Sequence, residues 1–159
     1  ASYGTQNASA VPMAPTGVAV DSAGNVYIAE QTNHLIAKVD TAGKIIAIAG
    51  NSFATGVKAS YGTQNASAVS LNSPSGVAVD SGGNVYIAEQ TNRLIEKVDT
   101  AGKIIAIAGN SFSTGVSASY GTQNASSVSL RNPIGVVVDT AGNIYISDAN
   151  NNKIEIIFP

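Results

Sequence analysis

The chain has 159 residues, of which 44% are hydrophobic and only 11% are charged, and its formal net charge is −2. A chain of this length and apolar content can bury one hydrophobic core. Its eight Lys and Arg residues are scattered, so no basic surface is expected for nucleic acid or for a membrane. It has no cysteine, which excludes disulfides and thiolate metal sites, and no apolar run approaches the ~20 residues that span a bilayer.

One stretch of sequence occurs three times. Residues 17–50 return almost unchanged as residues 76–109, and a shortened copy runs from residue 135 to the end, so that the period is 59 residues. A unit repeated at a fixed period is typical of a repeat architecture. We therefore divide the single domain, residues 1–159, into repeats 1–58, 59–117 and 118–159. Repeats this alike are typical of recent duplication or of an engineered repeat protein.

The first copy contains four short apolar runs that predict β-strands at residues 18–20, 26–29, 35–39 and 45–49. Asp21 and Asp40 open the turns between them, and Gly24 is free to adopt the positive φ that a hairpin turn needs. The third copy has runs at 144–147 and 153–158 and then stops, so its fourth strand is missing. No stretch has helical periodicity. The prediction is an all-β chain of four-stranded antiparallel units, the last with three strands.

Three motifs in each copy resemble the NHL repeat. In the second copy they are Pro74-Ser75-Gly76-Val77-Ala78-Val79-Asp80, Gly83-Asn84-Val85-Tyr86-Ile87-Ala88 and Asn92-Arg93-Leu94-Ile95. The resemblance implies a β-propeller, commonly six-bladed, in which the first strand of each blade lines a central channel. Three blades would be half of such a ring. It also implies binding of a protein, RNA or glycan-like ligand on one face, although a few related propellers are enzymes. Without a basic surface, we predict a protein or glycan ligand for this chain.

Polar residues recur where the second strand of each copy ends. In a propeller they would form a ring on one face, and with the tyrosines of the long linkers they are the predicted ligand-binding residues. The complete set is Glu30, Gln31, Asn33, Glu89, Gln90, Asn92, Asp148, Asn150, Tyr3, Tyr61 and Tyr120. Such oxygen-rich positions can bind Ca²⁺, but Glu and Asx side chains at strand ends also satisfy turn amides. We predict no metal and no cofactor.

Catalytic chemistry has few candidates in this sequence. His34 is the only histidine, and the other copies place Arg93 and Asn152 there, so neither a zinc site nor a Ser-His-Asp triad can be assembled from histidines. Three sequons, at Asn7, Asn65 and Asn124, match the N-glycosylation pattern. They are possible glycosylation sites, although short sequons also occur by chance in Asn- and Ser-rich sequence. The low charge and the many Ser, Thr and Asn residues predict a secreted or cell-surface protein.

The predicted function is non-enzymatic binding and assembly, with the chain either forming a homodimer that closes a six-bladed ring or being part of a longer propeller. Three alternatives stay open. One is a lyase- or lactonase-like propeller enzyme with a metal in its channel. Another is a structural subunit that polymerises through the open strand edge of its last blade. The third is an engineered repeat protein.

Overall fold

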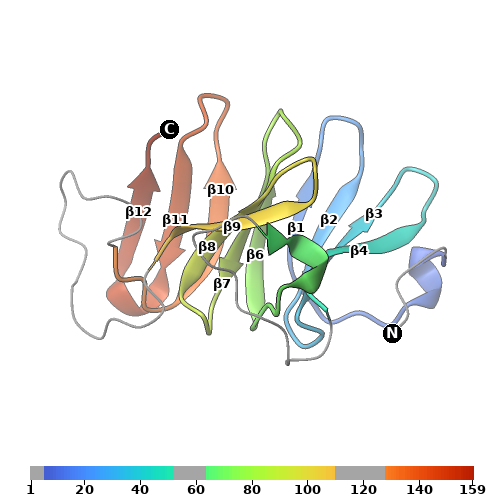
Figure 1. Cartoon of the computed structure of the whole chain (residues 1–159), viewed down its shortest axis with the longest axis horizontal. Coiled ribbons are helices and arrows are strands. Elements are labelled where there is room, and N and C mark those ends of the chain that lie inside the picture. Colours follow the sequence, from blue (N-terminus) through green and yellow to red (C-terminus); the bar gives the residue numbers. More distant parts are fainter. Residues whose placement is uncertain (1–5, 52–63, 110–127) are drawn as a thin grey trace.

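Three antiparallel sheets follow one another along the chain in the computed structural model, which describes residues 6–51, 64–109 and 128–159 (Figure 1). Blade 1 consists of β1 (Pro15–Val20), β2 (Val26–Glu30), β3 (Leu35–Val39) and β4 (Ile45–Ala49). Blade 2 consists of β6 (Pro74–Val79), β7 (Val85–Glu89), β8 (Leu94–Val98) and β9 (Lys103–Ala108). Blade 3 consists of β10 (Pro133–Val138), β11 (Ile144–Asp148) and β12 (Lys153–Ile157). The all-β, blade-by-blade prediction is therefore confirmed.

The predicted strand boundaries need small corrections. The first strand begins at Pro15 and not at residue 18, because the chain pairs with β2 on both sides of a register shift between Pro15 and Gly17. The last strand ends at Ile157. Blade 2 also gains a fifth strand, β5 (Gln64–Asn65), which pairs with the outer strand β9. Short 3₁₀ turns complete the described residues at η1 (Ala8–Ala10), η2 (Ala66–Ala68) and η4 (Ala149–Asn151). None of the described residues forms a helix long and apolar enough to cross a membrane.

Hairpin turns hold the first two strands of each blade in register. Asp21 accepts hydrogen bonds from the backbone N–H groups of Ala23 and Asn25, at 3.0 and 2.9 Å. Its second oxygen accepts from the side chains of Asn25 and Tyr27. The structural role predicted for this aspartate is therefore confirmed, and the same pattern recurs in the other two blades.

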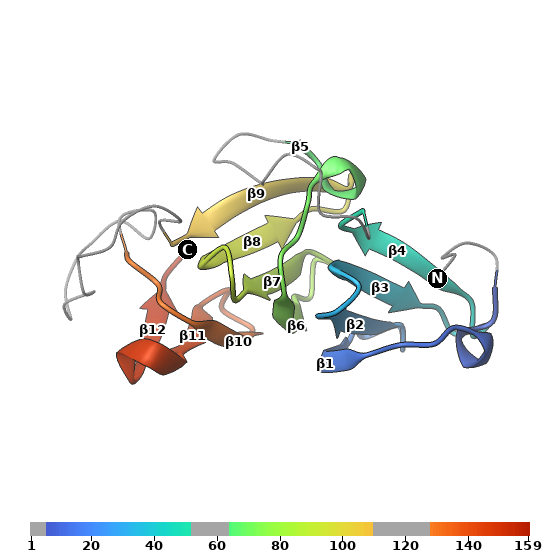
Figure 2. The same cartoon turned by 90° about the horizontal axis from the view of Figure 1, so that it is seen from below.

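Glycine lets the inner strands of neighbouring blades approach closely. A Cβ atom at Gly76 would lie 2.9 Å from the Cα of Gly135 and 2.9 Å from the carbonyl oxygen of Ile134. Strand β6 contacts β1 on one side and β10 on the other, and Figure 2 shows these three strands along the inner edge of a fan of sheets. The arrangement is an arc of propeller blades with their first strands innermost.

Hydrophobic side chains fill the two spaces between blades. The first core cluster joins Ile36 of blade 1 to Ile87 of blade 2, and the second joins Ile95 of blade 2 to Ile146 of blade 3. The segment before each inner strand adds one leucine to the space in front of it: Leu71 to the first cluster and Leu130 to the second, each 1% exposed. Because the repeats are nearly identical, the chain makes the same kind of contact twice.

Candidate functional site

The carboxylates at the ends of β2, β7 and β11 point into the protein. Glu30, Glu89 and Asp148 are each 0% exposed. Each accepts hydrogen bonds from backbone N–H groups of the segment that precedes its own blade: from Ala14 at 3.0 Å for Glu30, from Asn72 for Glu89, and from Arg131 (3.1 Å) and Asn132 (2.8 Å) for Asp148. These carboxylates anchor the entry of the chain into each blade.

Asparagine side chains in the turn after each of these strands also donate hydrogen bonds to the carboxylates. The Nδ2 atoms of Asn33, Asn92 and Asn151 donate to Glu30, Glu89 and Asp148, at 2.9, 2.8 and 2.6 Å. Asn92 is itself only 3% exposed. The sequence correctly brings these amides and carboxylates to one edge of the blades, but the geometry gives them partners within the chain. Their role in binding a ligand stays a prediction.

Gln31, Gln90 and Asn150 form the more accessible part of this predicted face. Gln31 donates from Nε2 to Oε1 of Gln90 at 2.8 Å, which links blade 1 to blade 2, and both side chains are half-buried. Asn150 is exposed, and its Oδ1 lies 3.4 Å from Nδ2 of Asn132. A ligand approaching this edge would meet these amides before the carboxylates behind them.

Tyr3, Tyr61, Tyr120 and the sequon residue Asn124 lie outside the described residues. The other two sequon residues, Asn7 and Asn65, are exposed, and Oδ1 of Asn65 accepts a hydrogen bond from Nζ of Lys103 at 2.7 Å.

In the part of the chain that the structure describes, no three His, Asp or Glu side chains lie close enough together to bind a metal ion. The Nδ1 atom of His34 instead accepts a hydrogen bond from the backbone N–H of Ser73 at 3.1 Å. His34, Arg93 and Asn152 also share a positive φ of 55°, 58° and 53°. This position is thus the left-handed residue of a tight turn in every blade.

Glu96 is a buried acid that the strand pattern alone did not single out. It is 0% exposed, and neither carboxyl oxygen has a hydrogen-bond partner of normal geometry. Burial raises its pKa well above the usual value, and the charge of the nearby Glu89 raises it further. Its burial could have been inferred from the alternation of β8, because Glu96 lies between the apolar residues Leu94 and Val98 on the same face of the strand, and both are buried.

The two ends of the arc carry exposed apolar residues. On blade 3, Val137, Ile154 and Ile156 are 62%, 57% and 46% exposed. At the other end, Val18 of blade 1 is 67% exposed. An open groove of about 560 Å³ lies in the blade 3 end, with Ile134, Ser147 and Ile154 in its lining. Sequence reasoning predicted an open edge on this blade but not which residues form it.

These blades and their inner glycine contacts define a protein of the β-propeller class. The chain contains three NHL repeats: the model of this repeat matches residues 14–39, 71–94 and 130–157. Each match begins in the segment before an inner strand and ends within the third strand of the blade. The resemblance seen in the sequence is therefore confirmed, with one repeat in each blade.

The chain is also similar to three larger proteins. Over 86 residues, 54% of this chain and 8% of the relative, it is 31% identical to the Arabidopsis thaliana protein SUPPRESSOR OF QUENCHING 1, chloroplastic. A structural genomics protein of unknown function from Bacteroides thetaiotaomicron matches with a TM-score of 0.68 and 21% identity, over 84% of this chain and 32% of that one. Virginiamycin B lyase from Staphylococcus aureus matches with a TM-score of 0.53 and 16% identity, over 98% and 45%. The chain spans less than half of each, and the two structural likenesses show the fold alone.

Proposed function

We propose that this chain is a non-enzymatic binding and assembly module that completes a six-bladed propeller by binding a second copy of itself. The supporting observation is that residues buried at the contacts within the chain are exposed at its ends. Ile154 is 57% exposed, whereas Ile36 and Ile95, at the same repeat position, are both 0% exposed. Val18 is 67% exposed, whereas its equivalent Val77 is 6% exposed.

The two end surfaces correspond to the two sides of one blade contact. The exposed residues at the end of blade 3 occupy the repeat positions that face the next blade in blades 1 and 2. The exposed residues at the end of blade 1 occupy the positions that face the preceding blade in blades 2 and 3. Two copies joined head to tail make two such contacts, and the assembly closes if three blades span half a turn. Full burial of an exposed Val or Ile contributes roughly 1.5–3 kcal/mol, so these ends favour association.

A closed ring of two chains would have two copies of the predicted ligand-binding edge. We propose that a protein or glycan ligand binds at the edge that carries Gln31, Gln90 and Asn150, and that the protein is secreted. Amide side chains donate and accept hydrogen bonds at once, which suits hydroxyl groups and peptide amides. This assignment rests on the accessibility of these three residues and on the repetition of Gln31 as Gln90 in the next blade. Blade 3 has Ala149 at that position, and its exposed amide comes from the next residue, Asn150.

The competing enzyme function has weaker support in the residues themselves. A lyase- or lactonase-like propeller with a channel metal needs several ligands that converge, and the described residues offer no group of three. Metal analysis of the purified protein tests this alternative: stoichiometric Ca²⁺ or Zn²⁺ would favour the enzyme.

Light scattering across a concentration series tests the proposed assembly. We expect a single species at twice the chain mass of 16.0 kDa. A mass that stays at 16.0 kDa at every concentration would contradict self-assembly, and a mass that keeps growing would favour the filament alternative.

A further inference from the structure

The groove at the end of blade 3 occupies a place that is filled at both blade contacts within the chain. The equivalents of its lining residues Ile134, Ser147 and Ile154 are Thr16, Ala29 and Ile36 in blade 1, and Ser75, Ala88 and Ile95 in blade 2. The corresponding isoleucines, Ile36 and Ile95, are completely buried. What covers them in the chain therefore indicates what would fit the open groove.

At both contacts the cover is the segment just before the inner strand of the next blade. Leu71 shares a core cluster with Ala29 and Ile36, and Leu130 shares one with Ala88 and Ile95. Hydroxyl groups fasten the same segments: Thr16 Oγ1 donates to the carbonyl of Pro74, and Ser75 Oγ to that of Pro133, at 3.3 and 3.2 Å. One apolar side chain and one proline carbonyl thus dock into each blade from the following one.

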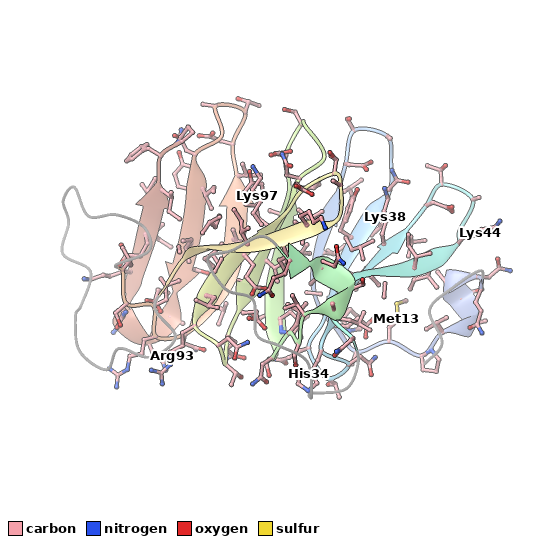
Figure 3. The ribbon with its side chains drawn as sticks, in the orientation of Figure 1. Met13, His34, Lys38, Lys44, Arg93 and Lys97 are labelled. Atoms are coloured by element: carbon pink, nitrogen blue, oxygen red, sulfur yellow. The ribbon has the colours of Figure 1, made fainter. Side chains whose placement is uncertain are left out.

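The first blade has this docking segment too, but no blade in front of it. Its sequence is Met13-Ala14-Pro15, and Met13 is the apolar residue at the place of Leu71 and Leu130. Met13 is half-buried, although both leucines are 1% exposed. It packs at the margin of a cluster that belongs to blade 1, and Figure 3 shows it at the end of the molecule opposite blade 3.

The groove is more apolar than its counterparts at one lining position and more polar at two others. Ile134 replaces the hydroxyl residues Thr16 and Ser75, whereas Ser147 replaces Ala29 and Ala88, and Lys153 replaces Leu35 and Leu94. Outside the lining, the exposed Ile156 of the same blade replaces Lys38 and Lys97. The two lysines lie over Tyr27 and Tyr86, with Nζ 5.2 and 5.5 Å from the ring centres. Ile134 and Ile156 therefore favour contact with an apolar side chain over contact with water at this end of the chain.

We infer that the blade 3 groove is the docking pocket for Met13 of a second copy of this chain. The inference rests on the proposed self-assembly and names the residues that make its contact. Methionine suits the pocket because its unbranched thioether adapts to an irregular apolar surface. Each of the two contacts in a closed ring then contains one Met13 from one copy and one Ile154 from the other.

Charge substitutions on the two sides of the pocket test the contact. Met13→Lys and Ile154→Glu each place a charge against an apolar surface, and we expect each to weaken self-association by about 10–100-fold. In the double variant, the introduced lysine of one copy lies opposite the introduced glutamate of the other copy at each contact. We expect its dissociation constant to be within about 10-fold of the wild-type value. Ile46→Glu is the matched control, because Ile46 is a 46% exposed isoleucine that pairs with Lys38, on the face of blade 1 that turns toward blade 2. Circular dichroism and thermal melting confirm that each variant folds.

The outcomes distinguish the Met13 pocket from the proposed self-assembly on which it rests. If the wild type associates and both single variants associate equally well, the pocket is wrong and self-assembly stands. If the wild type is monomeric throughout, both are wrong, and the ends are covered by something other than a second copy. Recovery in the double variant supports direct contact, since two folding defects would add and not cancel.

Discussion

The carboxyl group of Glu96 lies in the closed space between blades 1 and 2, beside the carboxyl group of Glu89. Both side chains are 0% exposed. Glu89 accepts hydrogen bonds from Asn72 and Asn92, whereas neither oxygen of Glu96 has a partner of normal geometry. Blade 1 has Ala37 at the equivalent position, so the fold does not require an acid there. We therefore expect the contact between blades 1 and 2 to depend on pH.

Glu96→Gln should therefore flatten the pH dependence of stability. The folded pKa of Glu96 is raised above its ordinary value of 4.5, chiefly by burial. The folded state thus holds this proton more tightly than the unfolded chain, and the wild type loses free energy of unfolding as pH rises above about 4.5, up to the folded pKa. We expect the variant to be more stable than the wild type by about 1–3 kcal/mol at pH 7 and by less at pH 4. Urea unfolding at both pH values measures the difference.

Glu155→Gln is the control for this experiment. Glu155 is the same repeat position in blade 3, and burial also raises its pKa, but it remains partly exposed. Its Oε1 atom is buried without a hydrogen-bond partner, whereas both oxygens of Glu96 are, so we expect its substitution to change the pH dependence less. Equal effects of the two substitutions would show that burial between blades is not the cause.

Asp80→Asn should weaken the protein in the opposite pH range. Burial tends to raise the pKa of Asp80, but hydrogen bonds from Asn84, Tyr86 and Gly82 outweigh it and hold the pKa below 3.8. This carboxylate stabilises the fold above pH 3.8, and the stabilisation is lost as pH falls through the folded pKa. At neutral pH we expect the variant to lose about 1–2 kcal/mol, after allowance for solvent screening. Asp99→Asn should cost less, because Asp99 accepts only two backbone hydrogen bonds in its turn; thermal melts at pH 7 and pH 3 compare the two.

Gly76→Ala should separate blades 2 and 3. Its new Cβ atom would lie 2.9 Å from both the Cα of Gly135 and the carbonyl oxygen of Ile134, and backbone atoms cannot move aside cheaply. We expect a loss of about 1–3 kcal/mol, the usual cost of overpacking. Gly82→Ala is the matched control, because blade 1 already has Ala23 at that position. A melting temperature unchanged by Gly76→Ala would refute the close approach of the inner strands.

Arg93→Asn should stabilise the chain slightly. Arg93 has a φ of 58°, a left-handed conformation that asparagine tolerates better than most residues with a side chain. Blade 3 already has Asn152 there, with a φ of 53°. We expect a gain of about 0.5–1 kcal/mol in the free energy of unfolding. Guanidinium titration of the two proteins would detect it, and a loss of stability would mean that Arg93 makes a contact that outweighs its backbone strain.

The strands could be predicted because each depends on local sequence. Period-2 apolar runs between Asp- and Gly-containing turns located residues 35–39 and 45–49 without error. Strand β5 was missed because it is a two-residue pairing of the polar linker residues Gln64 and Asn65, for which no local pattern exists.

The candidate site was only partly predictable. The repeat correctly located Glu30, Glu89 and Asp148 at equivalent strand ends, but their burial depends on where the preceding segment packs, which is a tertiary contact. Glu96 differs from them because an isolated acid in a strand usually faces solvent. It is buried by the neighbouring blade, and the sequence of its own strand does not describe that neighbour.

Electron-microscope images of the purified protein test the central claim most directly. The account predicts closed discs with six blades around a central channel, each formed by two chains of three blades. Isolated three-bladed arcs, or open chains of arcs that lengthen with concentration, would contradict it.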